Sequence, residues 1–222
     1  MYKVAIDGAS GTGKSTLAKR AAKRLGWVYV DTGALYRSIG LYVYENGLDP
    51  EDADAVSFVL PNVRLELKYE DGVQHVILNG RDVSDTIRLP EISMYASKVS
   101  KIPQVRAFLL GTQRDMAKKN NVIMDGRDIG TVIFPDAEVK IFVTVREEIK
   151  AQRRYKELIE KGVETTYEDV LRDMRTRDAA DASRDIAPCV PASDAVMFDN
   201  SDAPLDRAVD MICKIITDKV GK

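Results

Sequence analysis

The chain carries the stretch VAIDGASGTGKST at residues 4–16, and this stretch decides the fold. The short apolar run Val4–Ile6 is typical of a buried strand, and apolar residues recur at helical spacing from Ser15 to Leu25. Between them, residues 8–15 match the pattern G-x-x-x-x-G-K-[ST]. In such a loop, successive backbone N–H groups point inward and bind a polyphosphate at the start of the helix. The motif therefore predicts that the chain binds a nucleoside triphosphate.

Two side chains of this loop have expected roles. The Lys14 ammonium would reach the β- and γ-phosphates of ATP, and the Ser15 hydroxyl would bind Mg²⁺. The loop alone does not separate a kinase from a GTPase or a motor ATPase. No Asn-Lys-x-Asp motif is present, which argues against a GTPase, and 222 residues leave little room for a motor. The residues expected to bind the donor are Gly8, Ala9, Ser10, Gly11, Thr12, Gly13, Lys14, Ser15 and Thr16.

The composition argues against several other classes of protein. The chain is 45% hydrophobic and 31% charged, which excludes a disordered or fibrous chain. Its 33 Lys+Arg and 35 Asp+Glu give a net charge of −2, whereas a general nucleic-acid binder needs a basic surface. Cys189, Cys213 and His75 form no metal-binding pattern, and no apolar run approaches the ~20 residues of a membrane span. We expect a soluble, cytoplasmic monomer with neither nucleic acid nor membrane as partner.

Beyond the loop, short apolar runs alternate with segments of helical spacing. The strands are expected near residues 27–30, 122–124, 139–145 and 195–198, each preceded or followed by a helical segment. Strands separated by helices predict an α/β fold with a parallel sheet covered on both faces.

Residues 63–80 break this rhythm. Apolar and polar residues alternate on both sides of Asp71-Gly72, which predicts an antiparallel hairpin. We therefore expect a kinase core at 1–62 and 102–222, a lid at about 147–185, and an inserted subdomain at 63–101.

Two arginines stand where strands end. Arg37 follows Asp31-Thr32-Gly33 by one helical turn, and Arg127 follows the strand at 122–124. Ligands of open α/β sheets bind outside the carboxyl ends of strands, so these guanidinium groups are suited to a second phosphate in the same crevice. The alternative for Arg37 is a solvated surface arginine. The pattern favours phosphoryl transfer to an acceptor that is itself phosphorylated.

These residues together resemble the bacterial cytidylate kinase family, the P-loop nucleoside monophosphate kinases that act on CMP and dCMP. The resemblance runs through essentially the whole chain. It rests on the phosphate loop, on Asp31-Thr32-Gly33-Ala34-Leu35-Tyr36-Arg37, on residues 76–83, on the run DGRDIGTV at 125–132, and on residues 177–184. It implies a parallel five-stranded core, a helical lid, and a monophosphate-binding part with a small β-rich insert.

The resemblance also implies roles for individual residues. Lys14, Arg127 and Arg184 would be catalytic. The CMP phosphate would be held by Thr32, Tyr36, Arg37, Arg127 and Arg184. Cytosine would be read by Ser97, Arg106 and Asp128, the ribose by Arg177 and Asp181, and ATP would be covered by Arg153 and Arg154. The reaction implied is ATP + CMP ⇌ ADP + CDP.

Other interpretations remain open from the residues alone. Arg177 and Asp181 are four residues apart, so they could instead form an exposed ion pair on one helix face. Arg106, Arg153 and Arg154 could be solvated helix charges. The chain could also be another small P-loop kinase with a different acceptor, or a P-loop regulatory protein without turnover.

Overall fold

The computed structural model describes residues 1–70, 73–160 and 162–221. These residues form two compact units. The phosphate-loop unit contains Tyr2–Trp27 and the chain from Asn121 onward, and the middle unit contains Val28–Asn120 together with Met1. The predicted insert at 63–101 lies inside the middle unit. This unit is larger than the insert, since it also contains residues 28–62 and 102–120.

The strands of the described chain are β1 (Lys3–Asp7), β2 (Val28–Asp31), β3 (Leu65–Glu70), β4 (Val73–Leu78), β5 (Arg81–Asp82), β6 (Val122–Gly126), β7 (Val139–Thr144) and β8 (Val196–Asp199). The α-helices are α1 (Lys14–Leu25), α2 (Thr32–Glu45), α3 (Ala53–Val59), α4 (Pro90–Val99), α5 (Pro103–Asp115), α6 (Glu147–Glu160), α7 (Tyr167–Ala182) and α8 (Leu205–Val220). Single turns lie at Leu60–Asn62, Thr86–Arg88, Met116–Lys118 and Ile129–Ile133.

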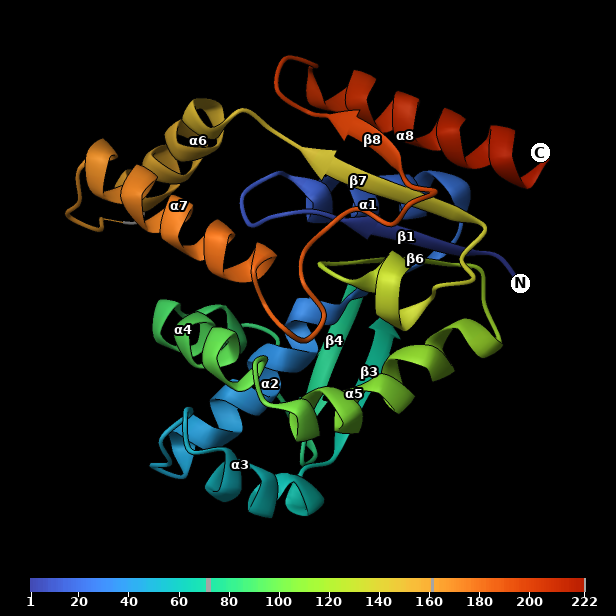
Figure 1. The fold of residues 1–222 in the computed structure, drawn as a ribbon. Helices are drawn as coiled ribbons and strands as arrows, with labels where there is room; N and C mark the ends of the chain where they lie inside the picture. The colour runs from blue at the N-terminus through green and yellow to red at the C-terminus, as the bar shows by residue number, and fades with distance from the viewer. Residues whose placement is uncertain (71–72, 161, 222) are drawn as a thin grey trace. The chain divides into compact units, whose positions relative to one another are not determined.

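Within the described residues, five strands form one parallel sheet in the order β2-β6-β1-β7-β8 (Figure 1). Its central strands are almost continuously buried, as expected when both faces of a parallel sheet are covered. In the phosphate-loop unit, α1 packs against α8 and lies on β6 and β1 (Figure 1). The predicted α/β fold with a parallel sheet flanked by helices is confirmed.

The register of β1 and β6 determines where the loops after them begin. Ile6 pairs with Asp125 and Asp7 pairs with Gly126, so the two strands end side by side. The glycine-rich loop therefore starts next to the segment that follows β6, although more than a hundred residues separate them in the sequence.

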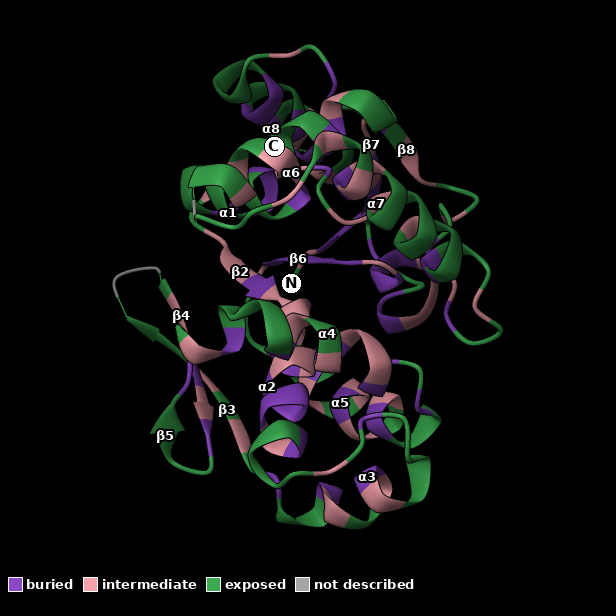
Figure 2. Ribbon diagram, turned by 90° about the vertical axis from the view of Figure 1, so that its left-hand side faces the viewer, coloured by how far each residue is buried: buried purple, intermediate pink, exposed green. Residues whose placement is uncertain are grey.

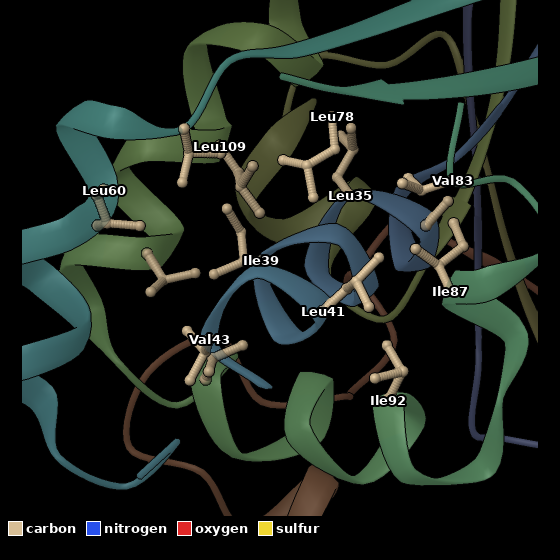
Figure 3. Close-up of a cluster of buried hydrophobic side chains, with 14 of the residues drawn as sticks. Leu35, Ile39, Leu41, Val43, Leu60, Leu78, Val83, Ile87, Ile92 and Leu109 are labelled. Atoms are coloured by element: carbon tan, nitrogen blue, oxygen red, sulfur yellow. The ribbon is translucent and has the colours of Figure 1, made fainter. Parts of the chain in front are cut away.

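The middle unit has its own hydrophobic core around α2. Much of α2 is buried (Figure 2). Its Leu35 and Ile39 are completely buried and pack with side chains from the hairpin, α4 and α5 (Figure 3). Helix α4 approaches α2 so closely that a Cβ on Gly40 would lie 2.8 Å from the backbone nitrogen of Ala96. The sequence reading did not anticipate α4, which starts at Pro90 directly after a single turn at Thr86–Arg88.

The antiparallel hairpin is present as predicted. Strands β3 and β4 pair from Leu65 opposite Leu78 to Glu70 opposite Val73, and β5 adds a short third strand. The predicted turn, Asp71-Gly72, lies outside the described residues.

The predicted lid segment forms α6 and α7, which lie side by side in the phosphate-loop unit (Figure 1). Helix α7 continues to Ala182, so it contains both Arg177 and Asp181. Among the described residues, no helix is both long enough and apolar enough to cross a membrane.

Candidate functional site: the phosphate loop and its surroundings

The glycine-rich loop has a backbone conformation that favours glycine at three of its positions, Gly8, Gly11 and Gly13. Gly8 has φ +151°, and a Cβ there would lie 2.4 Å from the carbonyl oxygen of Val143. Gly11 has φ +78°, in the left-handed region that other residues rarely occupy. The loop is braced from behind, because the Asn200 Nδ2 donates to the carbonyl of Thr12 at 2.9 Å.

The Lys14 side chain is buried beside this loop. Its Nζ donates to the carbonyl oxygen of Ala9 at 3.0 Å, so the ammonium lies across the loop. Burial lowers the pKa of Lys14, the nearby Arg127 lowers it further, and Asp125 works in the opposite direction. A cation in such a desolvated place interacts strongly with phosphate charge.

Ser15 contacts an acid that the sequence reading did not assign to the site. Its Oγ donates to Oδ2 of Asp125 at 2.6 Å, and Asp125 is buried in β6. Oxygen donors of this kind are what Mg²⁺ prefers. The sequence carries a signal for Asp125, because this acid directly follows the buried run at 122–124.

A second missed acid, Asp7, holds the segment after β6. Its two carboxylate oxygens accept hydrogen bonds from the backbone nitrogens of Ile129 and Gly130, both at 2.8 Å. Burial raises the pKa of Asp7 to about 7, although these two hydrogen bonds work against the rise. Asp7 thereby ties the end of β1 to the turn that carries Arg127 and Asp128.

Asp181 is the centre of a buried cluster of charges. Its exposed fraction is 1%, and its two oxygens accept hydrogen bonds from the guanidinium groups of Arg127 and Arg184. Burial on its own would lower the pKa of Arg127, but the charge and hydrogen bond of Asp181 outweigh it and raise that pKa. The structure therefore brings together three of the predicted site residues.

The interpretation of Asp181 and Arg177 as an exposed ion pair is wrong. Both lie on α7, but Asp181 turns inward to the two other arginines. Burial lowers the pKa of Arg177, and the neighbouring Arg127 adds to the effect. Arg177 itself keeps an exposed surface beside the cluster.

The two predicted lid arginines differ in their contacts. Arg153 donates to the carbonyl oxygens of Asn200 and Ser201 at 3.0 and 3.2 Å, next to the residue that braces the phosphate loop. Arg154 donates to Glu157 one turn along α6 at 2.8 Å, and both of these residues are partly buried. Arg153 is exposed but binds backbone carbonyls outside its own helix, whereas Arg154 pairs within α6.

In the middle unit, Asp31 organises the start of α2. One of its oxygens caps the helix by accepting from the Ala34 nitrogen at 3.0 Å, and the other accepts from Arg37 at 2.7 Å. The Nε of Arg37 is buried and has no hydrogen-bond partner among the described residues. A guanidinium held on one side by a carboxylate and unsatisfied at Nε can still bind an anion.

The other predicted acceptor residues of this unit lie on α2 or on α4 and α5, the two helices that pack against it. Thr32 and Tyr36 lie on α2, Ser97 on α4 and Arg106 near the start of α5. The Arg106 guanidinium lies over the Tyr36 ring, 5.6 Å from its centroid, and donates to the carbonyl of Ser100 at 3.2 Å. This arrangement fixes a cation and a ring in one place, which is not the solvated position that was the alternative for Arg106.

The fold and the loop define the class of the protein. The first strand of the parallel sheet leads through G-x-x-x-x-G-K-S into a helix, and arginines cluster near the end of the adjacent strand. A protein with these features is a P-loop phosphotransferase. An uncharacterized protein from Eubacterium ventriosum has the same fold, with a TM-score of 0.53 at 13% identity over 97% of this chain and 98% of that one.

The comparison of sequences narrows the class to a family. The family described as cytidylate kinase matches residues 4–218. The cytidylate kinase of Caldicellulosiruptor saccharolyticus is 44% identical over 218 residues, covering 98% of this chain and 96% of the relative. That of Thermosipho melanesiensis is 44% identical over 217 residues, covering 98% and 97%. The chain belongs to the cytidylate kinase family, whose members are ATP-dependent phosphotransferases, and the resemblance inferred from its motifs is confirmed.

Proposed function

We propose that the chain transfers the γ-phosphate of ATP to CMP or dCMP and so forms CDP or dCDP in pyrimidine metabolism. The observation that carries this proposal is the family match over residues 4–218, nearly the whole chain. It favours this reaction over a small P-loop kinase with another acceptor and over a P-loop protein without turnover.

On the donor side, the loop at 8–16 would hold the ATP phosphates. Lys14 would bind the β- and γ-phosphates, and Arg153 and Arg154 on α6 would lie toward the nucleotide. The burial of Lys14 supports its role, because a desolvated ammonium stabilises the charge that develops during transfer more strongly than a hydrated one.

Mg²⁺ fits the Ser15–Asp125 pair. The two oxygens are 2.6 Å apart, and both are hard ligands. Among the described residues there is no cluster of three or more metal-binding side chains, so phosphate oxygens and waters would complete the shell, as Mg²⁺ generally requires in kinases. The ion would neutralise phosphate charge, and Asp125 would orient the Ser15 hydroxyl.

On the acceptor side, the CMP phosphate would be bound by Thr32, Tyr36 and Arg37 of the middle unit and by Arg127 and Arg184 of the phosphate-loop unit. No general base is needed, because a phosphate monoester with a second pKa of about 6 is already anionic near pH 7. Catalysis is then positioning and charge neutralisation by Lys14, Mg²⁺ and the arginines.

The base would be recognised by Ser97, Arg106 and Asp128. A carboxylate accepts from the N4 amino group of cytosine and repels the O4 carbonyl of uracil. Replacing Asp128 by Asn should therefore narrow the ratio of CMP to UMP turnover, and an unchanged ratio would leave Asp128 a structural role.

Arg177 and Asp181 would meet the ribose. A carboxylate offers about four acceptor positions, and the two arginines use one on each oxygen of Asp181, which leaves capacity for a ribose hydroxyl. If the 2′-hydroxyl is bound there, Asp181→Ala reduces kcat/KM for CMP more than for dCMP. Equal losses would show that Asp181 acts only through its arginines.

One assay tests the reaction itself. ADP release is measured with CMP, dCMP, UMP, AMP and no acceptor, for the wild type and for Lys14→Ala. Two results together support the proposal. Turnover should require CMP or dCMP, and Lys14→Ala should reduce it by a factor that corresponds to about 3–4 kcal/mol. Turnover with another acceptor only, or ADP release without any acceptor, would refute it.

We also propose that the enzyme acts as a cytoplasmic monomer. Cys189 and Cys213 are free, buried thiols, as expected of a protein in a reducing compartment. Sedimentation at several protein concentrations would test the oligomeric state.

A further inference from the structure

Lys150 on α6 is a buried lysine for which the proposed reaction has no role. Its side chain is only 6% exposed. Its aliphatic stem lies against the phosphate loop, because a Cβ placed on Gly11 would be 3.0 Å from Lys150 Cγ and 3.5 Å from Cδ. The Cε of Met174, on α7, would be 2.8 Å from the same position. Lys150 and Met174 thus lie against the loop at Gly11.

The ammonium of Lys150 is bound by Asp178 of α7. Nζ donates to Oδ2 of Asp178, while Oδ1 of Asp178 is buried and has no hydrogen-bond partner among the described residues. A buried ion pair of this kind recovers its desolvation cost only when its remaining polar atoms are also satisfied. This pair leaves one oxygen unsatisfied, so it is a poor device for holding α6 on α7.

The two helices have another ion pair that shows the contrast. Arg175 of α7 donates to Glu147 of α6 at 2.9 Å, and both side chains are more than half exposed. An exposed pair of that kind carries little desolvation cost. The Lys150–Asp178 pair is therefore distinguished by its burial and by its position over the phosphate loop.

We propose that Lys150 is a second lysine that binds the donor phosphates. Asp178 holds the Lys150 ammonium beside the loop, and when ATP binds the ammonium leaves Asp178 and donates to a phosphate oxygen. This inference rests on the proposed function, because it takes ATP as the ligand of the loop. Lysine suits the task, since its ammonium carries three N–H donors on a flexible stem and the contact with Asp178 uses one of them. Asp178 then competes with the nucleotide for Lys150.

The test is the binding of ATP and of CMP, each measured by calorimetry for the wild type and three variants. Lys150→Met should weaken ATP at least tenfold, which corresponds to about 1.4 kcal/mol, and leave CMP unchanged. Asp178→Asn should bind ATP as tightly as the wild type or more tightly, because the competing charge is gone. Lys156→Met is the matched control, since Lys156 lies on the same helix, is 76% exposed and approaches Glu160 only at 3.9 Å.

A purely structural ion pair predicts a different pattern. Lys150→Met and Asp178→Asn would then lower the unfolding temperature alike and weaken ATP alike, and that result would overturn the proposal. If Lys150→Met does not fold, Asp178→Asn decides by itself, because weaker ATP binding contradicts competition. Wild-type protein that does not bind ATP would refute the proposed function, whereas wild-type binding matched by Lys150→Met would refute only the role of Lys150.

Discussion

Asp181→Ala should destabilise the fold strongly, because it removes the carboxylate between two buried guanidinium groups. The Asp181 side chain is 2% exposed, and those of Arg127 and Arg184 are 23% and 12% exposed. Removing one partner of a buried ion pair costs about 3–5 kcal/mol, since the remaining charge stays desolvated and unpaired. Both arginines are partly wet, so we expect the lower end, about 3 kcal/mol.

The free energy of unfolding is measured by urea titration without nucleotide, and the melting temperature by circular dichroism. For a chain of this length, about 3 kcal/mol corresponds to a fall of roughly 6–12 °C. The slope of the urea transition must match that of the wild type, because a changed slope would indicate that the two units unfold separately.

Asp202→Ala is the control for this measurement. Asp202 pairs with Arg146, but its side chain is 76% exposed, and such a pair contributes less than about 1 kcal/mol. If Asp181→Ala loses no more stability than Asp202→Ala, the cluster does not contribute as its burial implies, and the reasoning is refuted.

Three further predictions concern other parts of the molecule. Gly40→Ala should destabilise the protein in the same urea assay, because the new Cβ would lie 2.8 Å from the backbone of Ala96. Gly111→Ala should instead stabilise it by about 0.5–1 kcal/mol, because a Cβ there would have nothing within 4 Å. Burial raises the pKa of Asp7 from 3.8, the value expected in the unfolded chain, to about 7 in the folded protein. The stability that this shift contributes is therefore fully present below pH 3.8 and is lost as the pH rises through about 7. Asp7→Asn should flatten this fall in the free energy of unfolding, and an unchanged pH profile would contradict the shifted pKa. Arg37→Ala should raise KM for CMP far more than KM for ATP, and equal increases would remove Arg37 from the acceptor site.

Much of the candidate site could be predicted because its motifs are local. The phosphate loop needs only a strand, glycines at the required positions and a helix, and all of these follow one another within residues 4–25. The hairpin is equally local, since alternating residues on both sides of a short turn determine which strand positions face each other. The loop at Gly8 and the pairing of β3 with β4 agree with these expectations.

The contacts of the acidic residues could not be predicted in this way. Ser15 and Asp125 are 110 residues apart, and they meet because β1 pairs with β6 rather than with the strand that follows it in the chain. Periodicity reports which face of an element is apolar, but it does not report the order of strands in a sheet. The sequence therefore places Asp7 and Asp125 at strand ends but does not show which residues they contact, because that depends on the order of strands in the sheet.

Asp181 shows the same division most clearly. The sequence alone determined that it lies one turn from Arg177 on a helix, and from this spacing an exposed ion pair was a reasonable interpretation. Only the tertiary structure decided its surroundings, because the packing of α7 turns this carboxylate toward Arg127, which is 54 residues away in the sequence. Local sequence determines helices, strands and loops through interactions over a few residues, whereas burial and charge partners depend on which elements pack together, and that is a property of the whole chain.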